Sequence, residues 1–127
     1  MATVTVVTNL GRACLVNKAG GSNGSFGNPP FSINIGTGVG TAVNSMTSLF
    51  TESGSRFSAT GSQITTAVTN DTCQFTAVYT AVGTITVTNV GLFDKSTSGS
   101  LLMASTFSSI TLQSGDTLTV TFQIQFS

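Results

Sequence analysis

The chain has 127 residues and a formal net charge of zero, and only 6% of its residues are charged, against about 25% in ordinary domains. This length suits one domain, and without a basic patch to neutralise phosphates the composition argues against a nucleic-acid partner. It also argues against disorder, which combines low hydrophobicity with high charge. We predict one domain over residues 1–127, packed against other protein because a neutral surface lacks the repulsion that keeps proteins apart.

Signals for a membrane or a secretory route are missing from the sequence. No stretch approaches the ~20 apolar residues of a membrane-spanning helix, so we expect no membrane partner. Residues 1–8 have neither a charged region nor a continuous apolar core, which argues against a signal peptide. Cytosolic synthesis then favours free thiols at Cys14 and Cys73, which could form one disulfide at most.

The first sixteen residues predict two short strands. Residues 3–8 alternate between apolar and polar side chains, with Val4 and Val6 on one face, as in a half-buried strand. The sequence Asn-Leu-Gly at 9–11 is typical of a turn, and residues 12–16 predict a second short strand.

Residues 17–30 are the most irregular part of the sequence. They are rich in Gly, Asn and Ser and end in Pro29 and Pro30, a composition that favours no regular structure. We predict a long loop or arm here, and loops of this length are usually functional or disordered. Phe26 and Phe31 would give the arm aromatic side chains with which to dock.

The middle of the chain contains the one helical signal. Residues 31–35 predict a strand that ends at a glycine run, residues 36–40. This run lacks the Lys-Ser/Thr and the long helix of a phosphate-binding loop, so we interpret it as a strand-to-helix turn. Apolar residues then recur at spacings of three and four, which predicts one or two helical turns: Val43, Met46, Leu49 and Phe50.

From Arg56 onward the pattern is that of strands separated by turns. Alternating apolar residues predict strands over residues 63–68, 73–81, 85–90 and 101–103, with turn residues between them. The strand at 117–126 has five apolar residues at every second position: Leu118, Val120, Phe122, Ile124 and Phe126. Because turn residues precede it and residues 109–113 also alternate, we predict a hairpin over 109–126.

Together the strands define the fold class. About eight or nine strands with turns every 8–12 residues indicate an all-β fold, an antiparallel β-sandwich or β-barrel with at most one or two short helical turns.

The side chains that carry most enzyme chemistry are missing or isolated. Histidine is absent, which removes the commonest general base and the commonest metal ligand. Lys18 and Lys95 lie in Gly/Ser-rich stretches, where solvation explains them better than a Ser–Lys dyad. Asp94 and Asp116 are the most plausible carboxylate pair, although calcium needs several more oxygens. We predict no enzyme activity, no cofactor, no metal and no small-molecule substrate.

Several short motifs, in order along most of the chain, carry a family likeness. They are residues 8–13, 35–38, 49–52, 70–72, 90–94 with the continuation 98–102, and 115–118. With them the chain resembles the small β-rich virion proteins encoded in the structural-gene modules of tailed double-stranded DNA bacteriophages. The Gly/Pro-rich loop at 17–30 is longer than this family leads us to expect, so no role for it is carried over.

The resemblance implies a non-enzymatic virion protein, made in the host cytoplasm, of the capsid-decoration or tail-associated type. Our first interpretation is a decoration (cement) protein on the capsid surface, a homotrimer that clamps the major capsid protein. Strand addition and the long arm would supply the docking residues: Val4, Val6, Phe26, Pro29, Pro30 and Phe31. The alternative is a tail-tip or fibre component. A carbohydrate-binding β-sandwich is less favoured, because the chain has no Trp and one Tyr for stacking.

Overall fold

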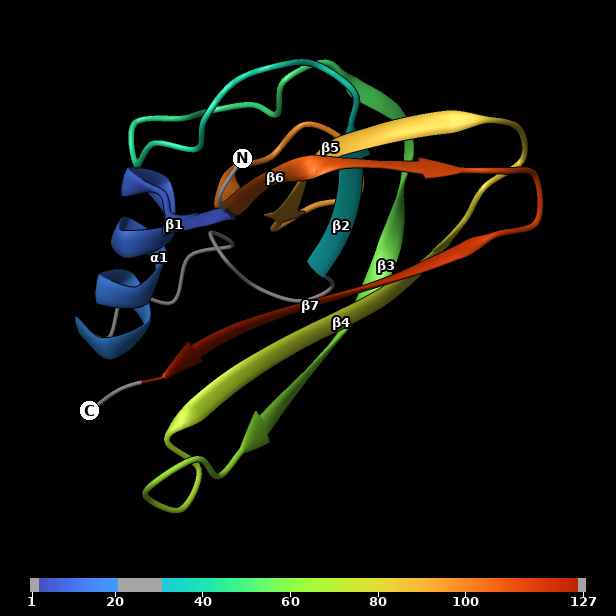
Figure 1. Cartoon of the computed structure of the whole chain (residues 1–127). Coiled ribbons are helices and arrows are strands. Elements are labelled where there is room, and N and C mark those ends of the chain that lie inside the picture. The colour runs from blue at the N-terminus through green and yellow to red at the C-terminus, as the bar shows by residue number, and fades with distance from the viewer. Residues whose placement is uncertain (1–2, 21–30, 126–127) are drawn as a thin grey trace.

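The computed structural model of the chain describes residues 3–20 and 31–125 (Figure 1). In chain order its elements are β1 (Val4–Val7), α1 (Asn9–Gly20), β2 (Phe31–Gly36), β3 (Glu52–Ile64), β4 (Thr72–Thr80), β5 (Ile85–Phe93), β6 (Leu101–Leu112) and β7 (Thr117–Gln125). The strands form one sheet in the order β1-β6-β5-β2-β3-β4-β7, and every neighbouring pair is antiparallel. The predicted all-β antiparallel class is confirmed, and the sheet is curled into a half-barrel.

The long strand β3 carries the sheet around its bend. Its residues 52–59 pair with β2, and its residues 60–64 pair with β4. Two tight connections, β4 to β5 and β6 to β7, cross between the two halves of the curled sheet and lie side by side in Figure 1. They are bonded to each other, because Ala81 N donates to Asp116 O (2.8 Å) and Gly115 N donates to Ala81 O (2.7 Å).

The main core fills the inside of the curl. On β7, Val120 and Phe122 are buried and the alternate residues Thr119, Thr121 and Gln123 are exposed, so the alternation predicted for this strand is confirmed. Phe126 lies outside the described residues. Buried side chains from the other strands complete the core, among them Ile33, Ile35, Ala77, Val87, Leu92 and Met103.

A second apolar cluster lies between the sheet and the connection 37–51. Its buried members are Ala42, Met46, Leu49, Phe93, Leu101 and Ala104. The helical turns predicted for residues 43–50 are wrong, because this connection runs without helix over the cluster. In place of helical hydrogen bonds, the two ends of the connection bond each other and a side chain of β5. Gly38 N donates to Phe50 O (2.9 Å), and the Asn89 side chain bonds both the N–H and the C=O of Phe50 (3.1 Å each). Of the apolar residues behind that prediction, Met46 and Leu49 anchor the connection to the cluster, Phe50 is half-buried against it and Val43 is exposed.

Helix α1 is the largest departure from the sequence prediction. The turn predicted at 9–11 and the strand at 12–16 are wrong, and residues 17–20 continue the helix instead of starting a loop. Thr8 caps the helix, since its hydroxyl accepts from Gly11 N (3.0 Å) and is itself bonded to the carbonyls of Leu101 and Leu102 on β6. Gly11 is required for close packing, because a Cβ there would lie 2.1 Å from Leu102 O.

Two strand predictions near the C-terminal half are also wrong. The strand predicted at 63–68 ends at Ile64, where the connection to β4 begins. The hairpin predicted over 109–126 has its turn, but β6 pairs with β1 and β5 while β7 pairs with β4. The turn before β7 was predicted correctly. The strands on its two sides nevertheless pair with other strands, because each packs its core face beside those partners. The predicted strand at 101–103 and the residues 109–112 form one continuous strand, β6.

The connection between β3 and β4 is organised by the carboxylate of Asp71. This carboxylate accepts hydrogen bonds from the backbone N–H groups of Thr66, Ala67 and Val68 at 2.9–3.0 Å. Those bonds, above all the one from Val68, hold the pKa of Asp71 well below its usual range.

We therefore expect acid to loosen this connection. A depressed folded-state pKa contributes stability that is complete above the ordinary value of about 3.9 and is lost as the pH falls below it. Asp71→Asn should lower the unfolding midpoint in denaturant at pH 7, and the difference from wild type should shrink steadily below about pH 4. A difference that stays constant between pH 7 and pH 2 would contradict this role for the carboxylate.

Candidate functional site

The structure separates the residues that the sequence predicted to dock. Val4 and Val6 on β1 are half-buried against the second cluster. Phe31 on β2 packs instead beside the main core, edge-on to Phe75 with ring centroids 4.9 Å apart. Phe26, Pro29 and Pro30 lie outside the described residues. The described members of the set therefore do not form one continuous surface, and their docking role stays a prediction.

A groove opens where β6 and β7 separate after their shared turn. This β6–β7 groove has a volume of about 410 Å³. It is lined by Thr5 of β1, Val90 of β5, Ser105, Phe107 and Ile110 of β6, and residues 118–123 of β7. None of these side chains is charged, and the apolar ones form its floor.

The backbone of β7 is open on the side of this groove. The bond from Ala81 N to Asp116 O lies in the register that β4 and β7 keep along their whole ladder. Because facing pairs in an antiparallel ladder alternate between bonded and non-bonded, the N–H and C=O groups of Thr119, Thr121 and Gln123 point away from β4. β7 is the last strand of the sheet, so among the described residues these groups have no strand partner.

The opposite wall of the groove is also a partly open edge. β1 pairs with β6 only over residues 103–106. Beyond Thr106, β6 has a strand partner on its β5 side alone, within the part of the chain that the structure describes, and that ladder bulges between Thr106 and Ile110. The groove is thus bounded by the edges of two strands that could each accept a further strand.

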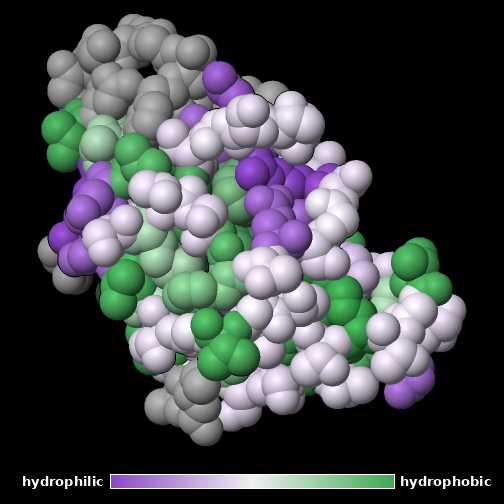
Figure 2. All heavy atoms as spheres, turned by 90° about the horizontal axis from the view of Figure 1, so that it is seen from above, coloured by the Kyte–Doolittle hydropathy of each residue, from purple (hydrophilic) through white to green (hydrophobic). Residues whose placement is uncertain are grey.

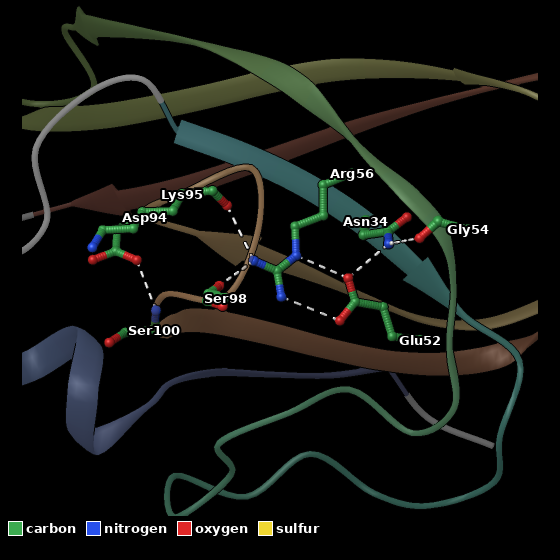
Figure 3. A network of polar contacts seen from close by, with 8 residues as sticks. All are labelled: Asn34, Glu52, Gly54, Arg56, Asp94, Lys95, Ser98 and Ser100. Atoms are coloured by element: carbon green, nitrogen blue, oxygen red, sulfur yellow. Dashed lines mark hydrogen bonds and ion pairs between the residues drawn. The ribbon is translucent and has the colours of Figure 1, made fainter.

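A separate polar network surrounds Arg56 (Figure 3). β3 bulges opposite Asn34, since Ile33 pairs with Phe57 while Ile35 pairs with Ser53, and the bulge directs Arg56 toward the connection 94–100. Its guanidinium bonds both carboxylate oxygens of Glu52 (2.8 and 3.3 Å).

The other contacts of Arg56 hold the connection after β5. The guanidinium donates to the carbonyl oxygens of Lys95 (3.1 Å) and Ser98, and its central carbon lies 3.5 Å from the centre of the Phe93 ring. The hydrogen bond from Arg56 is the main reason why the pKa of Glu52 is lowered, against the opposing effect of partial burial. The charges of Arg56 and Glu52 are thus both engaged in contacts within the protein that hold the connection 94–100 in place. We call this network the Arg56 clamp.

The residues considered for acid catalysis or metal binding are not brought together. Asp94 accepts from Ser100 N (2.7 Å) at the far end of β5, whereas Asp116 accepts from Gln113 N (2.9 Å) in the β6–β7 turn. The described residues contain no group of three His, Cys, Asp or Glu side chains that could hold a metal ion. No helix in the described part of the chain is long and apolar enough to cross a membrane.

Cys14 and Cys73 line the same apolar cavity. The cavity has a volume of about 220 Å³ and lies between α1 and the two halves of the sheet. Cys14 is buried, Cys73 is half-buried, and neither takes part in a disulfide. The remaining lining is apolar, with Leu15, Phe75 and Ile124 among its members.

The described structure is that of a β-rich protein with a curled sheet and uncharged open edges, in which the charges of Arg56 and Glu52 are used in internal contacts. Comparison with known families is more specific. Residues 29–125 match the model of the family described as Podophage GP4 fiber I protein gp80, and the chain belongs to this family. The resemblance to virion proteins of tailed phages is thereby confirmed, and the chain is a virion structural protein. No curated protein and no solved structure matches the chain.

Proposed function

We propose that the chain is a non-enzymatic structural component of a podophage tail fibre. The observation that carries this proposal is the family match over residues 29–125, whose description names a fibre protein. The match favours the tail-associated interpretation over capsid decoration, which was our first interpretation from the sequence. The major capsid protein is accordingly not the partner that we propose.

The surface of the molecule supports a role in permanent contact with other proteins. Figure 2 shows a face dominated by weakly polar residues, with single hydrophobic side chains scattered among them and strongly hydrophilic residues in a few small groups. Exposed valines on the described surface include Val39, Val43 and Val82. Such a surface gives little repulsion between neighbours, which suits a subunit held among other virion proteins.

The location can be tested by labelling intact particles. A peptide tag is placed after Ser127, and whole virions are imaged with gold-labelled antibody against the tag. Gold on the fibres is the expected result. Gold distributed over the heads, and retained on heads that have lost their tails, would refute the fibre assignment and restore capsid decoration.

A further inference from the structure

We infer that the β6–β7 groove is a strand-acceptor site, filled in the virion by an extended, uncharged segment of a neighbouring protein. The inference rests on the proposed function only in requiring that the chain is part of a virion. The segment would lie antiparallel to β7 and bond the outward N–H and C=O groups of Thr119, Thr121 and Gln123. Adding a strand to an open edge is a common way for proteins to recognise an extended peptide.

The β7 edge is unprotected against pairing with another strand. Edge strands of soluble proteins usually carry a charge, a proline or a bulge, or are very short, because an open row of backbone groups pairs with other chains. β7 is nine residues long, its ladder with β4 is regular from end to end, and its sequence TLTVTFQIQ contains neither a charge nor a proline. An edge of this kind is expected to be covered in the assembled particle.

The shape of the groove favours a single extended segment. Strand edges bound it on both sides, so it accepts a single extended segment more readily than the edge of a further sheet. Its floor is apolar at Phe107, Leu118 and Val120, whereas its exposed lining side chains are Thr and Gln together with the apolar Ile110. A segment with apolar side chains at alternate positions would place them on this floor and leave the others in water.

The lining of the groove and the order of the sheet indicate the chemistry and the source of the segment. The lining has no charged side chain, so a charged segment would lose its hydration without gaining an ion pair. Among the described residues a second copy could offer only an edge strand that remains part of its own sheet, and the two walls of the groove admit a single extended segment more readily than the edge of a sheet. We therefore assign the segment to a different virion protein.

Two substitutions on β7 test the acceptor edge. Thr121→Pro removes an N–H that points away from β4 and so leaves the β4–β7 ladder intact. Thr121→Lys keeps the backbone and places a charge at the edge. Thr60→Lys is the matched control, because Thr60 is also an exposed strand threonine but lies on β3, between β2 and β4.

The variants are supplied to a phage that lacks the wild-type gene, and the copies per purified particle are counted by quantitative mass spectrometry. We expect incorporation of both Thr121 variants to fall about tenfold or more, and that of Thr60→Lys to match wild type. Thermal unfolding of each purified variant shows whether it folds. If Thr121→Pro does not fold, Thr121→Lys still decides the result.

Hydrogen exchange on the wild-type protein gives an independent readout. The amides of Thr119, Thr121 and Gln123, which point away from β4, should exchange about tenfold more slowly in particles than in the free chain. Normal incorporation of both Thr121 variants, or equal exchange in the two states, would overturn the inference. Self-association of the free chain that Thr121→Pro abolishes would place a second copy at β7 and overturn the assignment to a different protein. Gold labelling of heads would refute the fibre role and leave the acceptor site standing.

Discussion

Phe122→Ala should lower the free energy of unfolding by ~3–5 kcal/mol, the usual cost of truncating a buried aromatic side chain. Phe122 is 3% exposed and lies in the main core, directly opposite Phe75 on β4. Its removal takes away apolar burial and leaves a cavity that the two halves of the curled sheet can fill only in part. Urea denaturation followed by circular dichroism measures the effect.

Thr119→Ala provides the control on the same strand. Thr119 is exposed and alternates with the core positions, so its truncation should change the free energy by less than about 0.5 kcal/mol. If Phe122→Ala cost under about 1 kcal/mol, well below the range for buried aromatics, the role of β7 as a wall of the core would be wrong.

Asn89→Ala should be the next most damaging change, with an expected loss of about 1–3 kcal/mol, because the N–H of Phe50 loses its partner and the C=O of Phe50 keeps only the bond from Gly38 N. Asn89 is 1% exposed, and its amide bonds both the N–H and the C=O of Phe50. The Asn89 side chain thereby takes the place of a strand partner for the backbone of Phe50. The connection 37–51 should detach locally, and limited proteolysis should cut it faster than in wild type.

The matched control is Asn44→Ala. Asn44 lies in the same connection, and its side chain is exposed, so its replacement should leave both stability and cleavage near the wild-type values. Equal cleavage of the Asn89 and Asn44 variants would show that the connection is held by the second apolar cluster alone.

Much of the fold follows from local patterns in the sequence. The alternation in β4 and β7 predicts these strands because one face of each meets a core while the other is more exposed. β5 alternates only in its first part, since its residues 89–93 are buried on both faces. Helix α1 was missed because Gly11 resembles a turn residue, whereas it is needed for contact with β6. The signal that could have revealed the helix is Thr8, an N-cap residue followed by apolar residues at 10 and 14.

The arrangement of the site could not be predicted in the same way. Turn chemistry at residues 114–116 predicts a reversal of the chain, but it does not specify whether the two strands pair with each other. That choice depends on the pairing of β7 with β4, which is distant in the sequence, and on the pairing of β6 with β5, its neighbour in the chain. The open edge of β7 and the groove beside it therefore emerge only once the sheet order is known. The Arg56 clamp was missed for the same reason, since a bulge in β3 creates it.

The continuity of β3 has a mechanical consequence that bears on the proposed fibre role. β3 pairs with β2 along its first part and with β4 along its second, so the two halves of the sheet share one covalent strand. A pulling force applied through β7 passes across the β4 ladder into β3 and reaches β2 without crossing a boundary between separable sheets. Under load the described domain is therefore expected to yield in one cooperative step, with no early rupture between its halves.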